Sequence, residues 1–263
     1  MNVLDRINYR NDLTSQPVRG GYLVLYTTSG SNPCACVIEN DERFVVDTKT
    51  YYALFESFEE ALYVASFINS SILSQRIKNL QSQGLFGARD IHKLIVQQPI
   101  PKYDPENELH RKIVEVAKEA IEKANKKVVK EYLKDVHSNR IRTEGRNILE
   151  FELYRIDYLI AKILGEEEPP PLRRLCLFVK TDIDQKKFIS KLKKLLKDRN
   201  IDAELRTLPL EVAIIKYEIE EMKDKDYSLA IEFTENIIGV EKSIKTILED
   251  LKKAKSIKKA IQI

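Results

Sequence analysis

Two apolar seams at helical spacing constrain the fold of this chain more than any other feature. Their members recur in steps of three and four residues: Leu109, Ile113, Val116, Ala120, Ala124 and Val128 in the first seam, and Leu149, Leu153, Ile156, Ile160 and Ile163 in the second. This spacing places one apolar stripe along each helix. Because the polar stretch "DVHSNRIRTEG" separates the seams, the pattern predicts an antiparallel helical hairpin over residues 106–166 with coiled-coil-like packing.

The residues before the hairpin combine strand and helix patterns. The runs "GYLVLYTT", "PCACVIEN" and "RFVVDTKTYYALF" are rich in β-branched and aromatic residues and are separated by turn residues, which predicts an antiparallel meander. Ser57 followed by Glu60 fits a capping box at the start of a helix that packs on this sheet. Residues 1–105 are therefore expected to form an α/β module.

The connector "GLFGARDIHKLIVQQPIPKYDP", residues 84–105, holds an unusual density of glycine and proline. Gly84 and Gly87 predict a tight turn that tucks Leu85 and Phe86 inward. Asp90 is expected to cap a short helical turn. At the other end, the pattern predicts Asp104 as the N-cap of a long helix with Pro105 at its first position.

Residues after the linker "GEEEPPP" have a third pattern. From 172 to 263 the order is strand, helix, strand, strand, helix, with a final strand compatible with "IKKAIQI". The stretch 203–219 is interpreted as one strand, with Pro209 at its start or on a sheet edge. This βαββα order predicts a small ferredoxin-like sandwich, so the whole chain is assigned to the α+β class.

Composition excludes few functions. The 263 residues carry 44 Lys and Arg against 41 Asp and Glu, so bulk charge does not indicate a nucleic-acid binder. Three cysteines and three histidines show no metal-ligand spacing, and we expect no metal site and a reducing, cytoplasmic location. No apolar run reaches membrane-spanning length, and the usage of Lys, Glu and Ile is similar to that of heat-adapted proteins.

Catalytic motifs are missing from the sequence. GxGxxG, GxxxxGK[ST], GxSxG and HExxH do not occur. Asn32-Pro33 supplies only the first half of the N-P-P-aromatic motif of adenine methyltransferases, and Cys34 cannot stack on a flipped base. We interpret this segment as a turn that opens the second strand, and we expect no catalytic residues, no cofactor and no enzymatic activity.

The order of several short motifs resembles a known family. Over residues 21–135 the chain is similar to the C-terminal target-recognition region of N6-adenine DNA methyltransferases and to the specificity subunits of type I restriction-modification systems. The motifs are Tyr51-Tyr52, Asn69-Ser70, the turn from Gly84 to Gly87, Asp90, and Pro99 to Pro101 before the long helix. The family's catalytic domain has no counterpart here, and residues 172–263 do not match the pattern.

What the resemblance implies is recognition of double-stranded DNA. The side-chain types that contact phosphates and bases gather in one window: Arg76, Lys78, Gln81, Gln83, Arg89, His92 and Lys93. The alternative is a solvated helix face, with Arg89 paired to Asp90. Of Tyr51 and Tyr52, which point to opposite faces of a strand, one is expected in the core while the other can stack on a base.

Two classes of function therefore stay open. The first is a non-catalytic DNA-recognition module that acts with a methyltransferase or a nuclease/helicase subunit. The second is a structural or regulatory protein-interaction module that has lost DNA binding. A homodimer is left open, and no membrane partner is expected. The lysines of "KKFISKLKKLLK" are interpreted as the solvated side of an amphipathic helix, with membrane-surface or RNA binding as the remote alternative.

Overall fold

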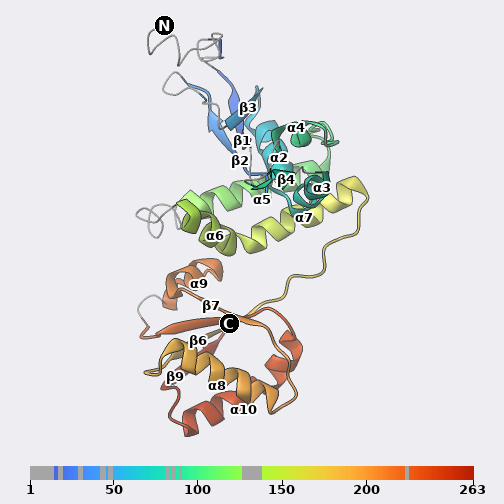
Figure 1. Cartoon of the computed structure of the whole chain (residues 1–263). Coiled ribbons are helices and arrows are strands. Elements are labelled where there is room, and N and C mark those ends of the chain that lie inside the picture. Colours follow the sequence, from blue (N-terminus) through green and yellow to red (C-terminus); the bar gives the residue numbers. More distant parts are fainter. Residues whose placement is uncertain are drawn as a thin grey trace. The chain divides into compact units, whose positions relative to one another are not determined.

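The chain divides into two compact units, drawn in Figure 1, which shows a computed structural model. Unit 1 comprises Met1–Ile121 and Glu152–Pro169, and unit 2 comprises Glu122–Phe151 and Pro170–Ile263. The limits of the units do not coincide with the boundaries expected near residues 105 and 166. Helices and antiparallel sheets occur in both units, which confirms the α+β class. The structure describes residues 15–16, 20–28, 32–41, 46, 50–80, 83–84, 87–88, 91–125, 138–222 and 225–263.

Unit 1 contains a three-stranded antiparallel sheet of β1 (Tyr22–Thr27), β2 (Ala35–Glu39) and β3 (Thr50–Phe55). The strand order is β2-β1-β3, so the expected meander, with the second strand in the middle, is wrong. The physical reason lies in β1, whose side chains are apolar on both faces and therefore favour the central position. Asn32–Cys34 lead directly into β2, and the bond from the Thr27 amide to the Cys34 carbonyl, at 3.1 Å, continues the β1–β2 register.

Helix α2 (Phe58–Asn69) packs against β1 and β2. The predicted cap is confirmed, since the Ser57 hydroxyl accepts a hydrogen bond from the Glu60 amide at 3.3 Å. The side chain of Asn69 makes two bonds of 2.9 Å to Ala35, accepting from its amide and donating to its carbonyl. Helix α3 (Ser71–Leu80) follows directly, and the Ser70 hydroxyl accepts from the amide of Leu73.

The glycine-rich connector forms a small hairpin. Strands β4 (Gln83–Gly84) and β5 (Gly87–Ala88) pair antiparallel, with Gly84 opposite Gly87, as expected of residues that flank a tight turn. Leu85, Phe86 and Asp90 lie outside the described residues, and their expected roles stay predictions. Helix α4 (Ile91–Val96) then contacts both α3 and β1.

The long helix α5 (Glu108–Lys123) starts later than expected. Asp104 caps only a turn, by accepting from the Glu106 amide, whereas Asn107 accepts from the Leu109 amide at the true helix start. Helix α7 (Glu150–Leu164) shares a core with α5 and α2 that is built from Leu62, Tyr63, Phe67, Ile113, Val114, Val116, Ala117, Ile156, Leu159 and Ile160. The two predicted seams therefore face the α/β module as well as each other.

A helix also occupies the polar stretch that was interpreted as a break. Helix α6 (Ser138–Ile148) belongs mostly to this stretch and contacts the later helix α9 within unit 2. The sequence of α6 has no apolar stripe that would predict a helix. Its main buried residue is Ile148, at the last position of the helix. The expectation of a non-helical break is therefore wrong for residues 138–145.

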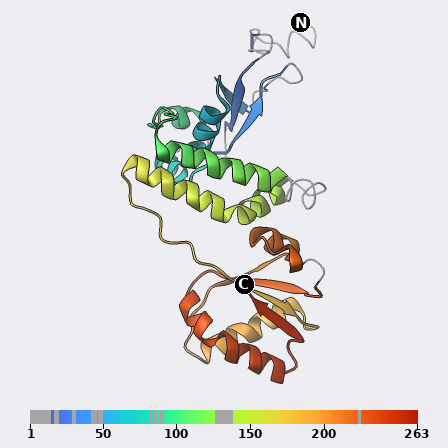
Figure 2. The same cartoon turned by 180° about the vertical axis from the view of Figure 1, so that it is seen from behind.

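Unit 2 is built on a four-stranded antiparallel sheet with the order β7-β8-β6-β9. Strand β8 lies between β6 and β7, the split βαβ arrangement expected for a ferredoxin-like sandwich. Helices α8 and α10 cover one face of the sheet and α9 lies on the other, as both views show (Figures 1 and 2). The elements are β6 (Leu175–Lys180), α8 (Gln185–Lys197), β7 (Leu205–Leu208), α9 (Leu210–Lys216), the 3-10 helix η3 (Glu220–Met222), β8 (Leu229–Phe233), α10 (Ile237–Lys253) and β9 (Lys259–Gln262).

The stretch 203–219 is not a single strand, which corrects the sequence interpretation. Strand β7 ends at Leu208, Pro209 stands at the N-cap position of α9, and α9 continues to Lys216. A short apolar run such as "LEVAIIK", of which Val212 to Lys216 are buried, fits a buried helix as well as a buried strand. Proline, with no amide proton and a fixed φ, suits this junction between strand and helix.

Candidate nucleic-acid interface

The predicted DNA surface contains an ordered aromatic stack on β3 and α4. The rings of Tyr51 and His92 lie 4.4 Å apart and 7° from parallel, and Tyr26 lies 6.1 Å from Tyr51 on the neighbouring strand. Tyr26 is buried, whereas 45 % of Tyr51 stays exposed. The ring of Tyr51 is thus held by neighbours although solvent reaches it. Tyr52 is half-buried, so neither tyrosine lies in the core, and the expectation that one of them would is wrong.

A hydrogen bond fixes the orientation of His92. Its Nδ1 lies 3.3 Å from the carbonyl oxygen of Thr28, so Nδ1 carries the proton and donates. The other ring nitrogen, Nε2, then has a lone pair with which to accept a hydrogen bond. Lys93 follows on α4 with an exposed side chain. This corner of unit 1 therefore brings together an aromatic ring, an imidazole and the exposed side chain of Lys93.

The remaining residues of the predicted DNA surface differ in their exposure, in their partners and in how much of them the structure describes. Arg76 on α3 forms an ion pair with Glu166, so its guanidinium is already engaged. Lys78 is exposed in the last turn of the same helix, which contacts α4. For Gln83 only the backbone is described, in β4, and Gln81 and Arg89 lie outside the described residues. The structure thus brings Lys78, His92 and Lys93 onto two helices in contact.

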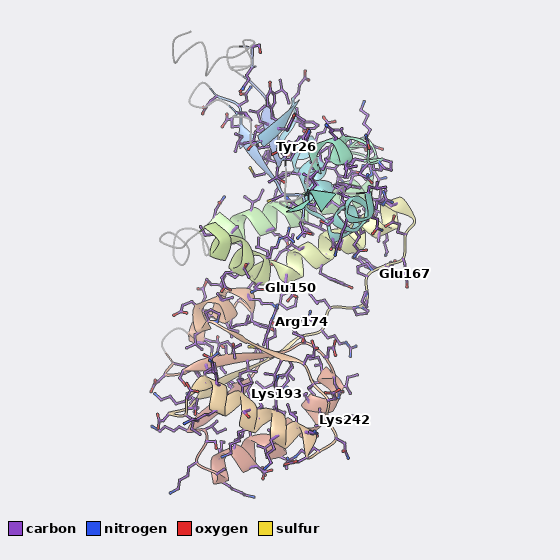
Figure 3. All side chains as sticks on the ribbon, viewed as in Figure 1. Tyr26, Glu150, Glu167, Arg174, Lys193 and Lys242 are labelled. Carbon is purple, nitrogen blue, oxygen red and sulfur yellow. The ribbon has the colours of Figure 1, made fainter. Side chains whose placement is uncertain are left out.

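A second polar constellation, absent from the sequence prediction, lies inside unit 2. We call it the ion cluster: Glu150, Arg174, Arg206, Lys216, Tyr217 and Glu232. The side chains of Lys216 and Glu232 are completely buried, and their Nζ and Oε1 atoms lie 2.6 Å apart. Lys216 also pairs with Glu150 at the first position of α7. Figure 3 labels Glu150 and Arg174, whose Oε1 and Nη2 atoms are 3.3 Å apart.

The two carboxylates of the ion cluster are fully engaged. Glu232 accepts from Lys216, from Arg206 and from the hydroxyl of Tyr217, the last at 2.6 Å. Burial alone would raise the pKa of Glu150, but the hydrogen bond and charge of Lys216, together with the charges of Arg206 and Arg174, lower it. Glu150 therefore stays ionised near neutral pH, and its bonds to three cations fit a structural role.

Burial and the charge of Glu232 disfavour ionisation of the Tyr217 hydroxyl and of the Cys176 thiol. Burial, the hydrogen bond to Glu232 and the Glu232 charge all raise the pKa of Tyr217. Burial and the same carboxylate raise the pKa of Cys176 to about 12, so the buried thiol is not a nucleophile at neutral pH. Sequence carried one signal of this cluster that was missed: a single charged residue within each of the apolar runs "VAIIKY" and "LAIEF".

Two kinds of feature are absent among the described residues: clusters of metal-ligating side chains and membrane-spanning helices. Its His, Cys, Asp and Glu residues form no group of three or more that could hold a metal ion. Among the same residues, no helix combines the length and apolar character needed to cross a bilayer. All three cysteines are free, and Cys34 and Cys36 are exposed.

Comparison with known proteins identifies no relative. No family model, no curated protein and no solved structure matches the chain.

Proposed function

We propose that the chain recognises double-stranded DNA through the surface of β3, α3 and α4, and that it supplies no catalysis of its own. In this proposal it acts in the cytoplasm with a methyltransferase or a nuclease/helicase subunit of a restriction-modification system. The observation that carries the proposal is the exposed Tyr51 ring, held against His92 beside Lys93. The motif order that resembles target-recognition regions supports the same surface.

Preorganisation is the physical reason for choosing this surface. An exposed tyrosine normally loses side-chain entropy when it binds a ligand. The ring contacts of Tyr51 and the Thr28 bond of His92 have already restricted both side chains. Tyrosine, histidine and lysine can contact phosphate oxygens, and aromatic rings can stack on an unpaired base. Binding would therefore use groups that are ordered before DNA arrives.

The first test measures the affinity of the full chain for a labelled duplex as a function of salt. If Lys78 and Lys93 contact phosphates, Lys78→Gln and Lys93→Gln should each reduce the slope of log affinity against log salt by about 0.9. Lys112→Gln is the matched control, because Lys112 is an exposed lysine of the same unit on α5 that pairs with Glu108. Equal effects of all three changes would indicate non-specific attraction and contradict the assignment of the surface.

Tyr51 allows a finer test. Tyr51→Phe keeps the ring and removes the hydroxyl, whereas Tyr51→Ala removes both. A stacking role predicts that only Tyr51→Ala weakens binding, by about 1–3 kcal/mol, and a phosphate contact predicts that both changes weaken it. If neither variant alters the affinity, Tyr51 lies outside the interface and the proposal fails.

A change next to Arg76 should strengthen DNA binding where the variants above weaken it. The carboxylate of Glu166 pairs with Arg76 and would compete with a DNA phosphate for its guanidinium. Glu166→Gln would release the guanidinium and should strengthen duplex binding, while Arg76→Gln should weaken it or leave it unchanged. Both variants remove one ion pair from the surface, so they are matched for stability. A weaker duplex complex in Glu166→Gln would show that Arg76 does not contribute.

Cofactor binding tests the non-catalytic part of the proposal. We expect no stoichiometric binding of S-adenosylmethionine by calorimetry and no methyl transfer to DNA. Tight cofactor binding would overturn this part. Absence of salt-sensitive affinity for any duplex, alone or with a methyltransferase partner, would leave the protein-interaction module as the surviving function.

A further inference from the structure

The open edge of the sheet in unit 2 carries backbone groups that face outward. Strand β7 is the last strand of the order β7-β8-β6-β9. The amide of Thr234 donates to the carbonyl of Glu204 at 2.9 Å, and these residues continue the register in which Arg206 lies opposite Glu232. In an antiparallel ladder, hydrogen-bonded pairs alternate with pairs whose N–H and C=O groups point away. The outward groups of β7 therefore belong to Leu205 and Thr207.

A groove runs along this edge between β7 and α8. Two adjoining depressions of about 860 and about 610 Å³ share Lys193 and Leu205, so they form one continuous trough. Apolar side chains of Ile189 and Leu196 contribute to its lining. The rest of the lining is mostly polar or charged. An edge strand with outward N–H and C=O groups beside such a trough has the geometry by which sheets accept an additional strand.

Basic side chains border the groove on the α8 side. Lys186, Lys193 and Lys197 recur at helical spacing and line the depressions, and Figure 3 labels Lys193 on this helix. All three are exposed, and none forms an ion pair with another described residue. Asp202 and Glu204 lie at one end of the trough only. The part beside Thr207 is therefore positively charged.

We propose that the β7–α8 groove binds an extended acidic polypeptide segment of a partner protein, which adds to the sheet as a strand beside β7. Main-chain bonds to Leu205 and Thr207 would provide the pairing. Because successive side chains of a strand point to opposite faces, the acidic side chains would lie on the face toward α8 and meet its lysines in the trough. The proposal concerns unit 2 and is independent of DNA binding by unit 1.

The contrast with the edge of unit 1 supports this assignment. At β2, the outward amide and carbonyl of Ala35 are both bonded to the side chain of Asn69. Unpaired edges invite addition of another strand, and proteins commonly block them. For Leu205 and Thr207, no comparable side-chain bond is present among the residues that the structure describes. The β7 edge has thus been left accessible beside a charged groove.

The test uses the full chain and a fluorescent probe peptide, acetyl-Glu-Val-Glu-Val-Glu-Val-Glu-Val-amide, followed by anisotropy. The expected result is saturable binding that weakens with salt. The double variant Lys193→Glu/Lys197→Glu should weaken binding by about tenfold or more, because it places like charges together. Lys242→Glu changes an exposed lysine on α10 and is the control, with affinity expected to stay the same.

Two further measurements examine the strand pairing itself. Thr207→Pro removes one outward N–H and leaves the β7–β8 ladder intact, since proline is tolerated on sheet edges; it should abolish binding. If this variant misfolds, an alternately N-methylated probe serves instead, because wild-type protein should bind it at least about tenfold more weakly than the parent peptide. Amide hydrogen exchange should show added protection of Leu205 and Thr207 on peptide addition.

The contrary outcomes are equally specific. No saturable binding of the probe, or binding unchanged by both Thr207→Pro and N-methylation, would overturn the proposal. If the lysine double variant lowers duplex DNA affinity while the peptide does not bind, the groove belongs to nucleic acid. A loss of DNA binding confined to the Lys78 and Lys93 variants would bear only on unit 1.

Discussion

Two buried polar side chains, one in each unit, are accommodated by different chemistry. In unit 1, buried His110 bonds to neutral groups: its Nδ1 accepts from the Asp104 amide at 3.0 Å, and its Nε2 lies 3.2 Å from the Tyr63 hydroxyl. In unit 2, Lys216 and Glu232 are buried as ions. A neutral pair loses one bond when a partner is removed, whereas a buried ion loses the charge that neutralises it. The two units should therefore differ in their response to substitution and to acid.

The largest effect is expected from Lys216→Met. This change preserves most of the side-chain volume but leaves Glu232 buried without its nearest cation. Breaking a buried pair in this way costs about 3–5 kcal/mol in unfolding free energy. Denaturant unfolding followed by circular dichroism measures the loss. Lys193→Met, on the exposed side of α8, should change the stability by less than about 0.5 kcal/mol. Similar values for both variants would remove the contrast between buried and exposed cations.

Tyr63→Phe should have a smaller effect in unit 1. The Asp104 bond fixes Nδ1 as an acceptor, so Nε2 carries the proton and donates to the Tyr63 hydroxyl. Removing that oxygen leaves a buried donor unpaired, at a cost of about 1–3 kcal/mol. Tyr103→Phe is the control, because Tyr103 stacks near His110 and no hydroxyl bond of it is seen among the described residues. A larger loss in Tyr63→Phe than in Lys216→Met would reverse the comparison.

Acid should act on the two units in different pH ranges. Burial lowers the pKa of His110, against an opposing effect of the Asp104 charge, so unfolding takes up a proton as pH falls below about 6.5. The pKa of Glu150 is also lowered, and its contribution is lost only as pH falls below about 4.3 and through the folded value. Unfolding midpoints measured from pH 7.5 to 3.5 should fall in both ranges. His110→Asn should flatten only the upper range and Glu150→Gln only the lower one.

The smallest effect is expected at an exposed ion pair. Arg155 on α7 pairs with Glu119 on α5, and about half of each side chain is accessible to water. Arg155→Ala should cost about 0.2–1 kcal/mol and should cost less at high salt. Unfolding at two salt concentrations measures both values. A cost that is large and independent of salt would indicate that the aliphatic part of Arg155, and not its charge, contributes to packing.

Local patterns in the sequence predicted much of this fold, and contacts distant in sequence account for most of what was missed. Ser57 and its neighbours contain the whole signal for the α2 cap, and apolar periodicity contains the signal for α5 and α7. By contrast, Lys216 lies 66 positions from Glu150. Lys216 and Glu232 each stand in an apolar run, and no local pattern shows which charge is the partner of which. The apolar character of both faces of β1 favours the centre of the sheet, but which strands flank β1 depends on its pairing with β3, a contact distant in sequence.

The candidate DNA surface was also predictable only as far as local sequence patterns reach. Residue type and crowding selected Lys78, His92 and Lys93, which α3 and α4 bring into one region. The stack of His92 on Tyr51 joins residues from two separate elements, and the ion pair of Arg76 with Glu166 joins residues 90 positions apart. Such partners decide whether a cation is available to a ligand, and they become visible only when the fold is known.

Asn69 gives the edge of unit 1 a property that neither a serine nor a leucine could supply. A primary amide contains the same donor and acceptor as one peptide group, and here both bond to Ala35. One side chain at the end of α2 therefore imitates a single residue of a missing strand. The imitation works at only one alignment of helix and strand, because a shift of β2 by one position would turn both Ala35 groups away. Asn69 thus sets the register of the sheet from outside it, and Asn69→Leu would release that register while exposing an edge at which two copies of the chain could join.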